Sequence, residues 1–124
     1  MHFLLMCCID EQRWNDLPQA RRDEVMHAYG AWIDQATSQG QYVGGGKLAD
    51  TASAACVTSA AGKPTVTDGP FAETKEQLGG YHILDCANRD EALALAACIP
   101  TLPAGGKIEV RPLHHLIPGT HTHL

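Results

Sequence analysis

An α+β fold is predicted for this chain by three observations. Short apolar or alternating runs of strand length recur along it, two segments carry apolar residues at helical spacing, and stretches containing glycine or proline separate them. The 124 residues, 44% of them hydrophobic and 19% charged, fit one folded domain and argue against disorder. We therefore expect a single small domain with one hydrophobic core.

The first part of the chain predicts a strand followed by an amphipathic helix. The apolar run 2–9 is typical of a buried strand, and the polar stretch 10–17 predicts a loop. Pro18 suits the first turn of a helix that continues to Gly40, a residue typical of helix ends. The apolar positions of this helix recur every three or four residues: Val25, Met26, Tyr29, Trp32, Ile33 and Ala36.

The middle of the chain is rich in turn signals. The three glycines at 44–46 predict a turn or a close approach of two backbones. The segments 51–59 and 64–67 predict two strands of a hairpin that turn at 60–63. The segment 72–78 predicts a loop with a helical turn, because glycine and proline break the pattern just before it.

The last part of the chain predicts two further strands around a second helix. The strands are expected at 81–86 and 107–113, the second of which alternates apolar and charged residues. The helix is expected at 92–99, where alanine and leucine are dense. Asn88 is placed to cap it, and Glu91 stands three residues later, as in a capping box.

The order of these elements is close to a ferredoxin-like βαββαβ plan. Two helices can cover only one face of a four-stranded sheet, so the other face needs a cover. The simplest cover is a second copy of the chain, and we expect a homodimer through the sheet face. The stretch 114–124 has no clear period, so the domain is expected to cover residues 1–113 and to be followed by a tail.

Composition excludes several classes of function. Nine basic against fourteen acidic residues give a formal charge of −5, which argues against a nucleic-acid partner. No apolar run approaches the roughly 18 residues that span a bilayer, so no membrane partner is expected. The opening MHFLLMCCIDEQR lacks a basic start and a small-residue cleavage site, so we do not expect a secretory signal. These features favour a cytoplasmic protein.

Cysteine and histidine usage gives no sign of a metal site. The five cysteines are odd in number and lack a metal-binding spacing, so we interpret them as small buried hydrophobes in a reducing compartment. Four histidines lie in the tail beside Pro118 and Gly119, where adventitious metal binding is a more economical interpretation than a built site. A redox or metal role for these residues is kept as the weakest hypothesis. No cofactor motif is present either.

The segment 67–76 holds the densest cluster of polar residues. Three of them are carboxylates, Asp68, Glu73 and Glu76, on a backbone shaped by glycine and proline. Crowded carboxylates in a cleft repel one another, so one of them could act as an acid or a base. The alternative is structural: Asp68 bonds backbone N–H groups of its own loop, and the two glutamates are solvated or pair with a lysine.

The run VTDGPFAETKEQLGGYHILD resembles the signature of the YCII-related, or DGPF-domain, family. The opening strand, the first helix, the glycine stretch and the closing Val110-Arg111-Pro112 are similar to that family as well, so the resemblance covers almost the whole chain. It implies a dimeric α+β barrel in which two sheets pack face to face. Some relatives have been proposed to be enzymes because a histidine on the first helix meets an aspartate near its end. The matching positions here are Tyr29 and Ser38.

Two functions are consistent with these observations. In the first, the homodimer binds a small molecule in a cleft between the first helix, the sheet and residues 68–76, called the DGPF loop below. Acid–base chemistry without a cofactor would use Asp68 as the base or as an orienting carboxylate, Glu73 as a second polar wall and Tyr29 as a hydroxyl donor. In the alternative, the domain is a non-enzymatic regulatory or interaction module. The DGPF loop is then a brace, fastened by Asp68 and plugged into the core by Phe71.

Two aromatic or imidazole side chains have competing interpretations. Tyr29 could instead be a core aromatic whose hydroxyl reaches a polar partner. His82 faces opposite to Tyr81 on the strand 81–86, so one of these two would meet the interface if the sheet packs on its twin.

Overall fold

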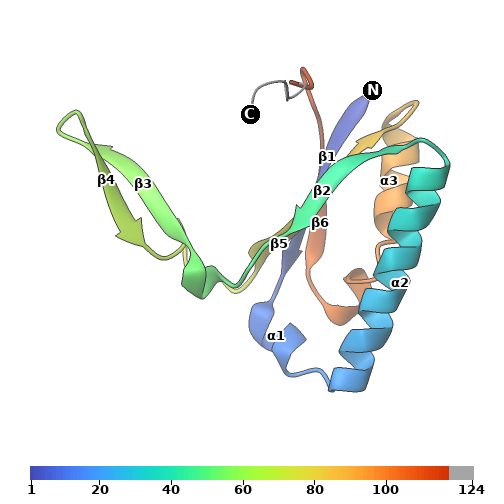
Figure 1. The fold of residues 1–124 in the computed structure, drawn as a ribbon, viewed down its shortest axis with the longest axis horizontal. Helices are drawn as coiled ribbons and strands as arrows, with labels where there is room; N and C mark the ends of the chain where they lie inside the picture. The colour runs from blue at the N-terminus through green and yellow to red at the C-terminus, as the bar shows by residue number, and fades with distance from the viewer. Residues whose placement is uncertain (118–124) are drawn as a thin grey trace, which may run out of the picture.

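The computed structural model describes residues 1–117 as a four-stranded antiparallel sheet, two long helices on one of its faces, and a separate two-stranded hairpin (Figure 1). The strands are β1 (His2–Ile9), β2 (Tyr42–Lys47), β3 (Ala55–Ala60), β4 (Lys63–Asp68), β5 (Gln77–Asp85) and β6 (Lys107–Pro112). The helices are α1 (Glu11–Asn15), α2 (Gln19–Ser38) and α3 (Arg89–Ala97), with 3₁₀ turns at Thr51–Ser53 and Leu102–Ala104. The expected tail falls partly outside the described residues, and His121 and His123 lie there.

The strand order of the main sheet is β2-β5-β1-β6, and every neighbouring pair is antiparallel. Numbered along the chain, this is the second strand beside the third, then the first and the fourth, as a ferredoxin-like βαββαβ chain arranges them. The α+β fold class predicted from the sequence is therefore confirmed. The strand β1 occupies the middle of the sheet with β5 on one side and β6 on the other.

The second strand of the βαββαβ plan is β2, and not one of the two strands that the sequence pattern predicted at 51–59 and 64–67. The glycine stretch at 44–46 forms an edge strand, so the turn expected there is wrong and the alternative, a close approach of two backbones, is confirmed. The predicted strands of the hairpin form a sheet of their own. The strand β5 begins earlier than expected because Gly79 and Gly80 continue its ladder. A Cβ on Gly80 would lie 3.2 Å from the carbonyl oxygen of Gly46, so small residues permit this close pairing.

The short helix α1 replaces the loop expected at 10–17. It forms because the side chain of Asp10 accepts a hydrogen bond from the backbone N–H of Arg13 at 3.1 Å, which caps the first turn. The cap predicted for α3 is confirmed, since the Asn88 side chain accepts from the backbone N–H of Glu91 at 2.9 Å.

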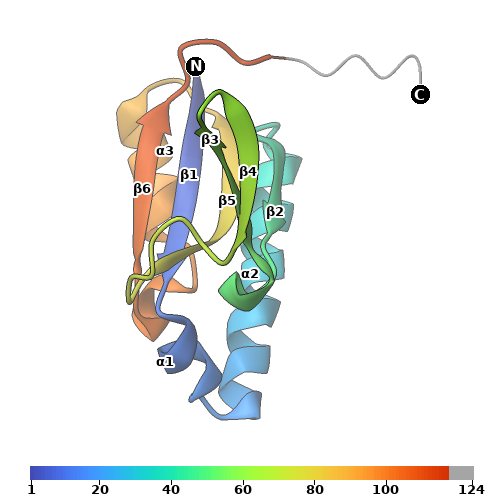
Figure 2. The same cartoon turned by 90° about the vertical axis from the view of Figure 1, so that its left-hand side faces the viewer.

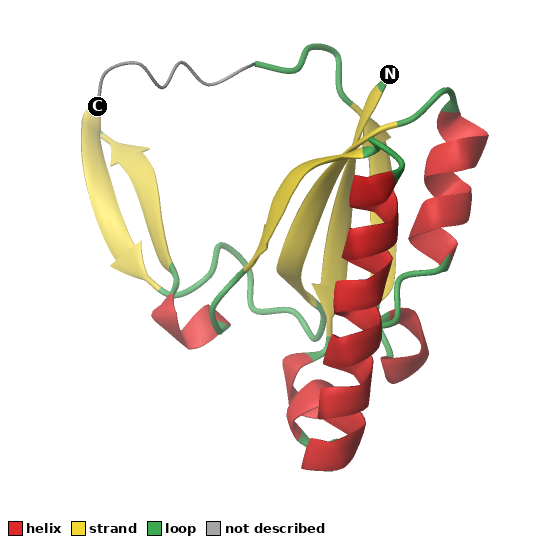
Figure 3. Cartoon of the chain, turned by 45° about the vertical axis from the view of Figure 1, so that its right-hand side comes forward, coloured by secondary structure: helices red, strands yellow, loops and turns green. Residues whose placement is uncertain are grey.

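The hydrophobic core lies between the sheet and the two long helices (Figure 3). Alternate residues of β1 point into it, and Phe3, Leu5 and Cys7 are buried there. The helix α2 contributes Trp32, whose indole N–H donates to the carbonyl oxygen of Leu95 at 3.0 Å. No helix within residues 1–117 is long and apolar enough to cross a membrane.

Among residues 1–117, no helix covers the opposite face of the sheet. Its residues are half-buried and mostly apolar: Leu4, Met6, Cys8, Tyr81 and Ile83.

The β3–β4 hairpin, called the arm below, projects on this side of the sheet (Figures 1 and 2). Val57 and Val66 pair across the arm and are 68% and 66% exposed. Phe71 is 93% exposed, so the expectation that it plugs the core is wrong.

Candidate functional site

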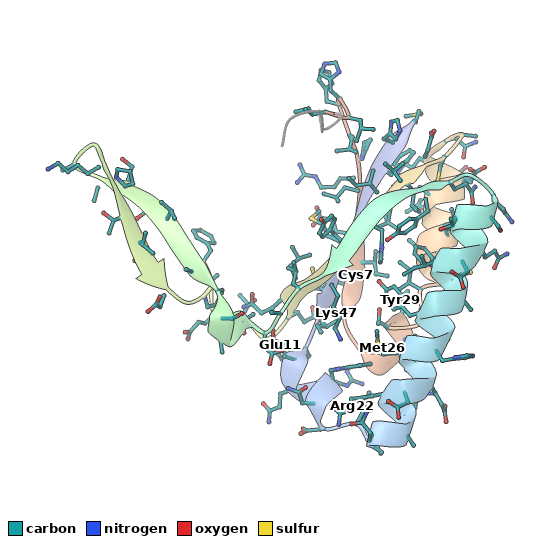
Figure 4. The ribbon with its side chains drawn as sticks, viewed as in Figure 1. Cys7, Glu11, Arg22, Met26, Tyr29 and Lys47 are labelled. Carbon is teal, nitrogen blue, oxygen red and sulfur yellow. The ribbon has the colours of Figure 1, made fainter. Side chains whose placement is uncertain are left out.

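A cavity of about 460 Å³ lies between α2, α1 and the helix-facing side of the sheet. Figure 4 shows Cys7, Met26 and Tyr29 between the sheet and α2, with Lys47 and Glu11 near the ends of β2 and β1. Most of its wall is apolar, and Ile9, Trp14, Met26, Ile33 and Leu48 contribute to it. The cavity therefore offers a small ligand a largely dry surface.

An imidazole held between two phenols forms the polar part of this wall. His82 is 3% exposed, and it faces the helices because its neighbours on β5 alternate. The Nδ1 atom of His82 lies 2.7 Å from the hydroxyl oxygen of Tyr42, and its Nε2 atom is hydrogen-bonded to the hydroxyl of Tyr29. All three side chains line the cavity. We call them the Tyr29–His82–Tyr42 cluster.

Helical spacing brings Tyr29 to this cluster. It lies four residues after Val25 and three before Trp32, two buried residues of α2, so it shares their face. Its ring and that of Trp32 meet edge to face with centroids 6.1 Å apart. The ring centroids of Trp32 and His82 lie 5.1 Å apart, so the indole packs against the imidazole as well.

A β-bulge brings Tyr42 to the cluster. The register of β2 against β5 shifts between Tyr42 and Gly44, and a bulge of this kind redirects the side chain beside it. Gly45 then leaves room for the contact. A Cβ at this position would collide with the backbone carbonyl oxygen of Tyr81, and it would lie 2.5 Å from the Tyr42 hydroxyl oxygen and 2.8 Å from Nδ1 of His82.

Burial keeps the cluster uncharged at neutral pH. It lowers the pKa of His82 to about 4, because the charged imidazolium loses its hydration. The same cause raises the pKa of the Tyr29 and Tyr42 hydroxyls above their usual values. A neutral imidazole has one N–H donor and one acceptor nitrogen, so one phenol donates to His82 while the other accepts from it.

Cys7 extends the cluster toward the centre of the sheet. Its Sγ atom lies 3.6 Å from the hydroxyl oxygen of Tyr29, and its side chain is buried on β1. Burial raises the pKa of this thiol, so it is protonated and uncharged as well. The thiol can donate to the phenol or accept from it, but only weakly.

Charged side chains stand at the more exposed end of the cavity. Glu11 accepts hydrogen bonds from the backbone N–H and the hydroxyl of Thr51, at 3.0 and 2.9 Å. This contact ties α1 to the segment between β2 and the arm. Lys47 and Asp50 are exposed and line the same end.

The three residues predicted for the site do not come together. Tyr29 lines the cavity, as described above. Glu73 is exposed and lines a separate depression with Asp10 and Lys75. Asp68 is exposed at the end of β4, and within residues 1–117 its side chain makes no hydrogen bond or ion pair. The DGPF loop therefore lies apart from the cavity.

His82 and Tyr42 are the residues that the sequence prediction of the site missed. A signal for His82 existed, because the imidazole stands in register with Leu84, the core-facing residue two positions later. Tyr42 carried no such signal, since its direction depends on the bulge in β2.

Comparison with known proteins gives a family and a fold. A family model for the YCII-related domain matches residues 1–116. The uncharacterised protein R00369 of Rhizobium meliloti (strain 1021) is 38% identical over an alignment of 126 positions, and the alignment covers 96% of this chain and 97% of that protein. A solved structure of 5-chloro-2-hydroxyhydroquinone dehydrochlorinase (TftG) from Burkholderia phenoliruptrix AC1100, in complex with 2,5-dihydroxybenzoquinone, matches with a TM-score of 0.55 at 18% identity. The match covers 93% of this chain and 95% of that one, and it shows a shared fold.

Proposed function

The chain belongs to the family of the YCII-related domain, as its motifs predicted, and we propose that it binds a small molecule in the cavity and transfers protons to and from it without a cofactor. The observation that carries this proposal is the Tyr29–His82–Tyr42 cluster, an imidazole between two phenols on the wall of an apolar cavity. Histidine and tyrosine are side chains that donate and accept protons in catalysis. A core histidine with a purely structural role needs no cavity beside it.

The shape and polarity of the cavity favour a compact ligand with an apolar body. Its wall is mainly aliphatic and aromatic, and the inner polar groups are uncharged at neutral pH. Hydroxyl or carbonyl groups on the ligand would match the phenols and the imidazole. TftG, whose structure contains a ring compound with hydroxyl and carbonyl groups, supports a ligand of this kind.

The uncovered sheet face supports the homodimer that we propose for the chain. Leu4, Met6 and Ile83 form an apolar surface there, and a second copy could bury it by packing sheet against sheet. Light scattering on a purified sample tests this proposal, with Ile83→Asp as the variant. We expect twice the chain mass for the parent and the single-chain mass for the variant. A monomeric parent contradicts it.

A non-enzymatic interaction module remains the second candidate, favoured by the arm. Val57, Val66 and Phe71 expose apolar side chains away from the core, on a hairpin and loop that are available to a partner. This candidate predicts a protein partner and no role for the cavity.

A thermal-shift screen against small metabolites separates the two candidates. A ligand that binds the native state raises the melting temperature by mass action. We expect at least one compound to stabilise the parent and Asp68→Ala but not His82→Gln. A compound that stabilises His82→Gln as much as the parent contradicts the cavity as its site. A panel without any shift, on parent protein that is folded, favours the interaction module.

A further inference from the structure

The two ring nitrogens of His82 suggest a specific kind of proton transfer, and this inference rests on the function proposed above. Each nitrogen has a phenol as its partner, and both phenols line the same cavity. A single acid or base would need only one such partner. The arrangement instead connects two points of the cavity through one imidazole.

We propose that the Tyr29–His82–Tyr42 cluster is a two-ended proton relay that tautomerises uncharged, enolisable carbonyl compounds. The relay needs a neutral imidazole, which exists as two tautomers. When Nδ1 carries the proton, it donates to the oxygen of Tyr42, and Nε2 accepts from the hydroxyl of Tyr29. The hydroxyl proton of Tyr42 is then available to a ligand, and the Tyr29 oxygen keeps a lone pair that can accept from it beside the weak contact with the Cys7 thiol. In the other tautomer the two phenols exchange these roles.

The reaction step balances without any charged intermediate. The carbonyl oxygen of the substrate takes the hydroxyl proton of Tyr42, and Tyr42 takes the proton from Nδ1 of His82. Nε2 takes the hydroxyl proton of Tyr29, and Tyr29 takes a proton from the carbon beside the carbonyl group. The carbon's electron pair forms the carbon–carbon double bond while the carbonyl π bond opens to the new O–H bond. The product is the enol, and His82 is left in its other tautomer.

The same relay returns to its starting state in either of two ways. The reverse reaction, or ketonisation of an enol substrate, runs every transfer backwards. Exchange with water also restores the first tautomer, because the cavity is open at the end where Glu11 and Lys47 stand. No oxidant, reductant or co-reactant is required.

Burial determines the class of substrate. The inner wall offers hydroxyl, imidazole and thiol groups, and the charged residues of the cavity, Glu11, Lys47 and Asp50, are less deeply buried. A carboxylate or phosphate beside His82 would lose its hydration without a cationic partner. Uncharged ketones and keto esters avoid this cost, so they are the expected substrates.

The test measures keto–enol interconversion of three uncharged probes by ultraviolet absorbance: 2-acetylcyclohexanone, 1,2-cyclohexanedione and ethyl acetoacetate. We expect the parent protein to accelerate at least one of them above the buffer rate. Acetoacetate is the matched charged probe for ethyl acetoacetate, and the expected rate for it is at least tenfold lower. Equal rates for the two probes would overturn the substrate class.

The variants test the relay itself. General acid–base groups typically contribute a factor of about 10² to 10⁴, so Tyr29→Phe and Tyr42→Phe should each lower kcat about 100-fold. The double variant should lose no more than either single variant, because residues that act as one unit are not additive. Tyr81→Phe is the matched control, since this phenol lies on the other face of β5, and its rate should stay within twofold of the parent.

A proton inventory adds a measurement that a structural role would not change. Several protons move together in the relay, so the rate should fall along a curve, not a line, as deuterium replaces hydrogen in the solvent. A linear inventory, or a parental rate in Tyr42→Phe while Tyr29→Phe is inactive, shows one phenol acting alone and overturns the relay.

Failure of the relay and failure of the proposed function give different results. If the thermal-shift screen finds a ligand that depends on His82 but none of the three probes is accelerated, the tautomerisation is wrong and the binding site stands. If neither a ligand nor an acceleration is found with folded protein, both are wrong.

Discussion

The DGPF loop and the cavity differ in how their polar residues are arranged. The loop concentrates its carboxylates within a few consecutive residues, and those of Asp68 and Glu73 are exposed to water. The cavity collects single polar residues from β1, α2, β2 and β5, and His82 there is buried with both ring nitrogens paired. An exposed polar group is satisfied by water, whereas a buried one requires partners in defined places. Density of polar residues along the chain is therefore a weaker guide to a site than burial.

The largest expected contrast is between the losses of stability when a phenylalanine of the core and one of the DGPF loop are replaced by alanine. Phe3 is 1% exposed in the core, and Phe71 is 93% exposed in the DGPF loop. Phe3→Ala should lower the free energy of unfolding by about 3–5 kcal/mol, and Phe71→Ala by less than about 0.5 kcal/mol. Urea denaturation at one protein concentration measures both. A large loss for Phe71→Ala would show that the loop packs against another molecule in solution.

The second contrast is in pH dependence. Burial lowers the pKa of His82 to about 4, whereas the ordinary value of a histidine is 6.5. As the pH falls, the unfolded chain therefore takes up a proton at this histidine before the native chain does. The contribution of the neutral imidazole to the free energy of unfolding is complete above about pH 6.5. It falls by up to about 3 kcal/mol as the pH drops toward 4. Denaturation at pH 7.5 and 4.5 checks this in the parent and in His82→Gln. The parent should lose more stability between these two conditions, and equal losses contradict the buried neutral imidazole.

A third contrast lies within β2, between two adjacent glycines. A Cβ on Gly45 would collide with the backbone carbonyl oxygen of Tyr81 and would also crowd Tyr42 and His82, whereas a Cβ on Gly44 would have no atom within 4 Å. Gly45→Ala should cost about 1–3 kcal/mol of unfolding free energy through overpacking and should abolish ligand binding in the cavity. Gly44→Ala should be neutral or stabilise the chain by up to about 1 kcal/mol. Thermal melts and the ligand screen on both variants compare them, and similar behaviour would remove the argument for a close contact at Gly45.

The smallest expected effect on stability comes from replacing Asp68. Its exposed side chain makes no hydrogen bond within residues 1–117, so Asp68→Ala should change the unfolding free energy by less than about 0.5 kcal/mol. The brace hypothesis expects a loss of about 1–3 kcal/mol, the usual cost of leaving buried donors unpaired. Urea denaturation distinguishes these ranges. A loss in the higher range would restore the DGPF loop as a structural element, for instance within the proposed dimer.

Local signals predicted much of the fold and one member of the cluster. The apolar run of β1, the spacing of α2 and the cap at Asn88 depend on near neighbours in the chain, and each was found from the sequence. The spacing of α2 predicted the face on which Tyr29 lies, and the resemblance to the YCII-related family made it a site candidate, because it matches the helix histidine of some relatives. The helix α1 was missed because its cap is a single aspartate at the end of an apolar run.

The strand β2 and the contacts that join Tyr29, His82 and Tyr42 could not be found in this way. Three glycines carry no alternating pattern, and they form a strand only because β5 offers a ladder beside them. His82 reaches Tyr29 across 53 positions of sequence, and Tyr42 reaches His82 across 40. A pattern of neighbouring residues does not indicate which residues so far apart in the sequence come into contact.

The amino-acid sequence by itself determined the α+β class, the first and last strands, the two long helices and the hairpin, because these follow from periodicity, capping and turn residues close together in the chain. It also determined the family, through the resemblance carried by the run around Asp68-Gly69-Pro70-Phe71. Only the tertiary structure decided which strands share a sheet and which polar side chains share a cavity. The physical reason is that strand pairing and burial are long-range. The antiparallel ladder of β5 with β1 and β2 places His82 on the helix-facing side of the sheet, where it is buried and both ring nitrogens are hydrogen-bonded to phenols.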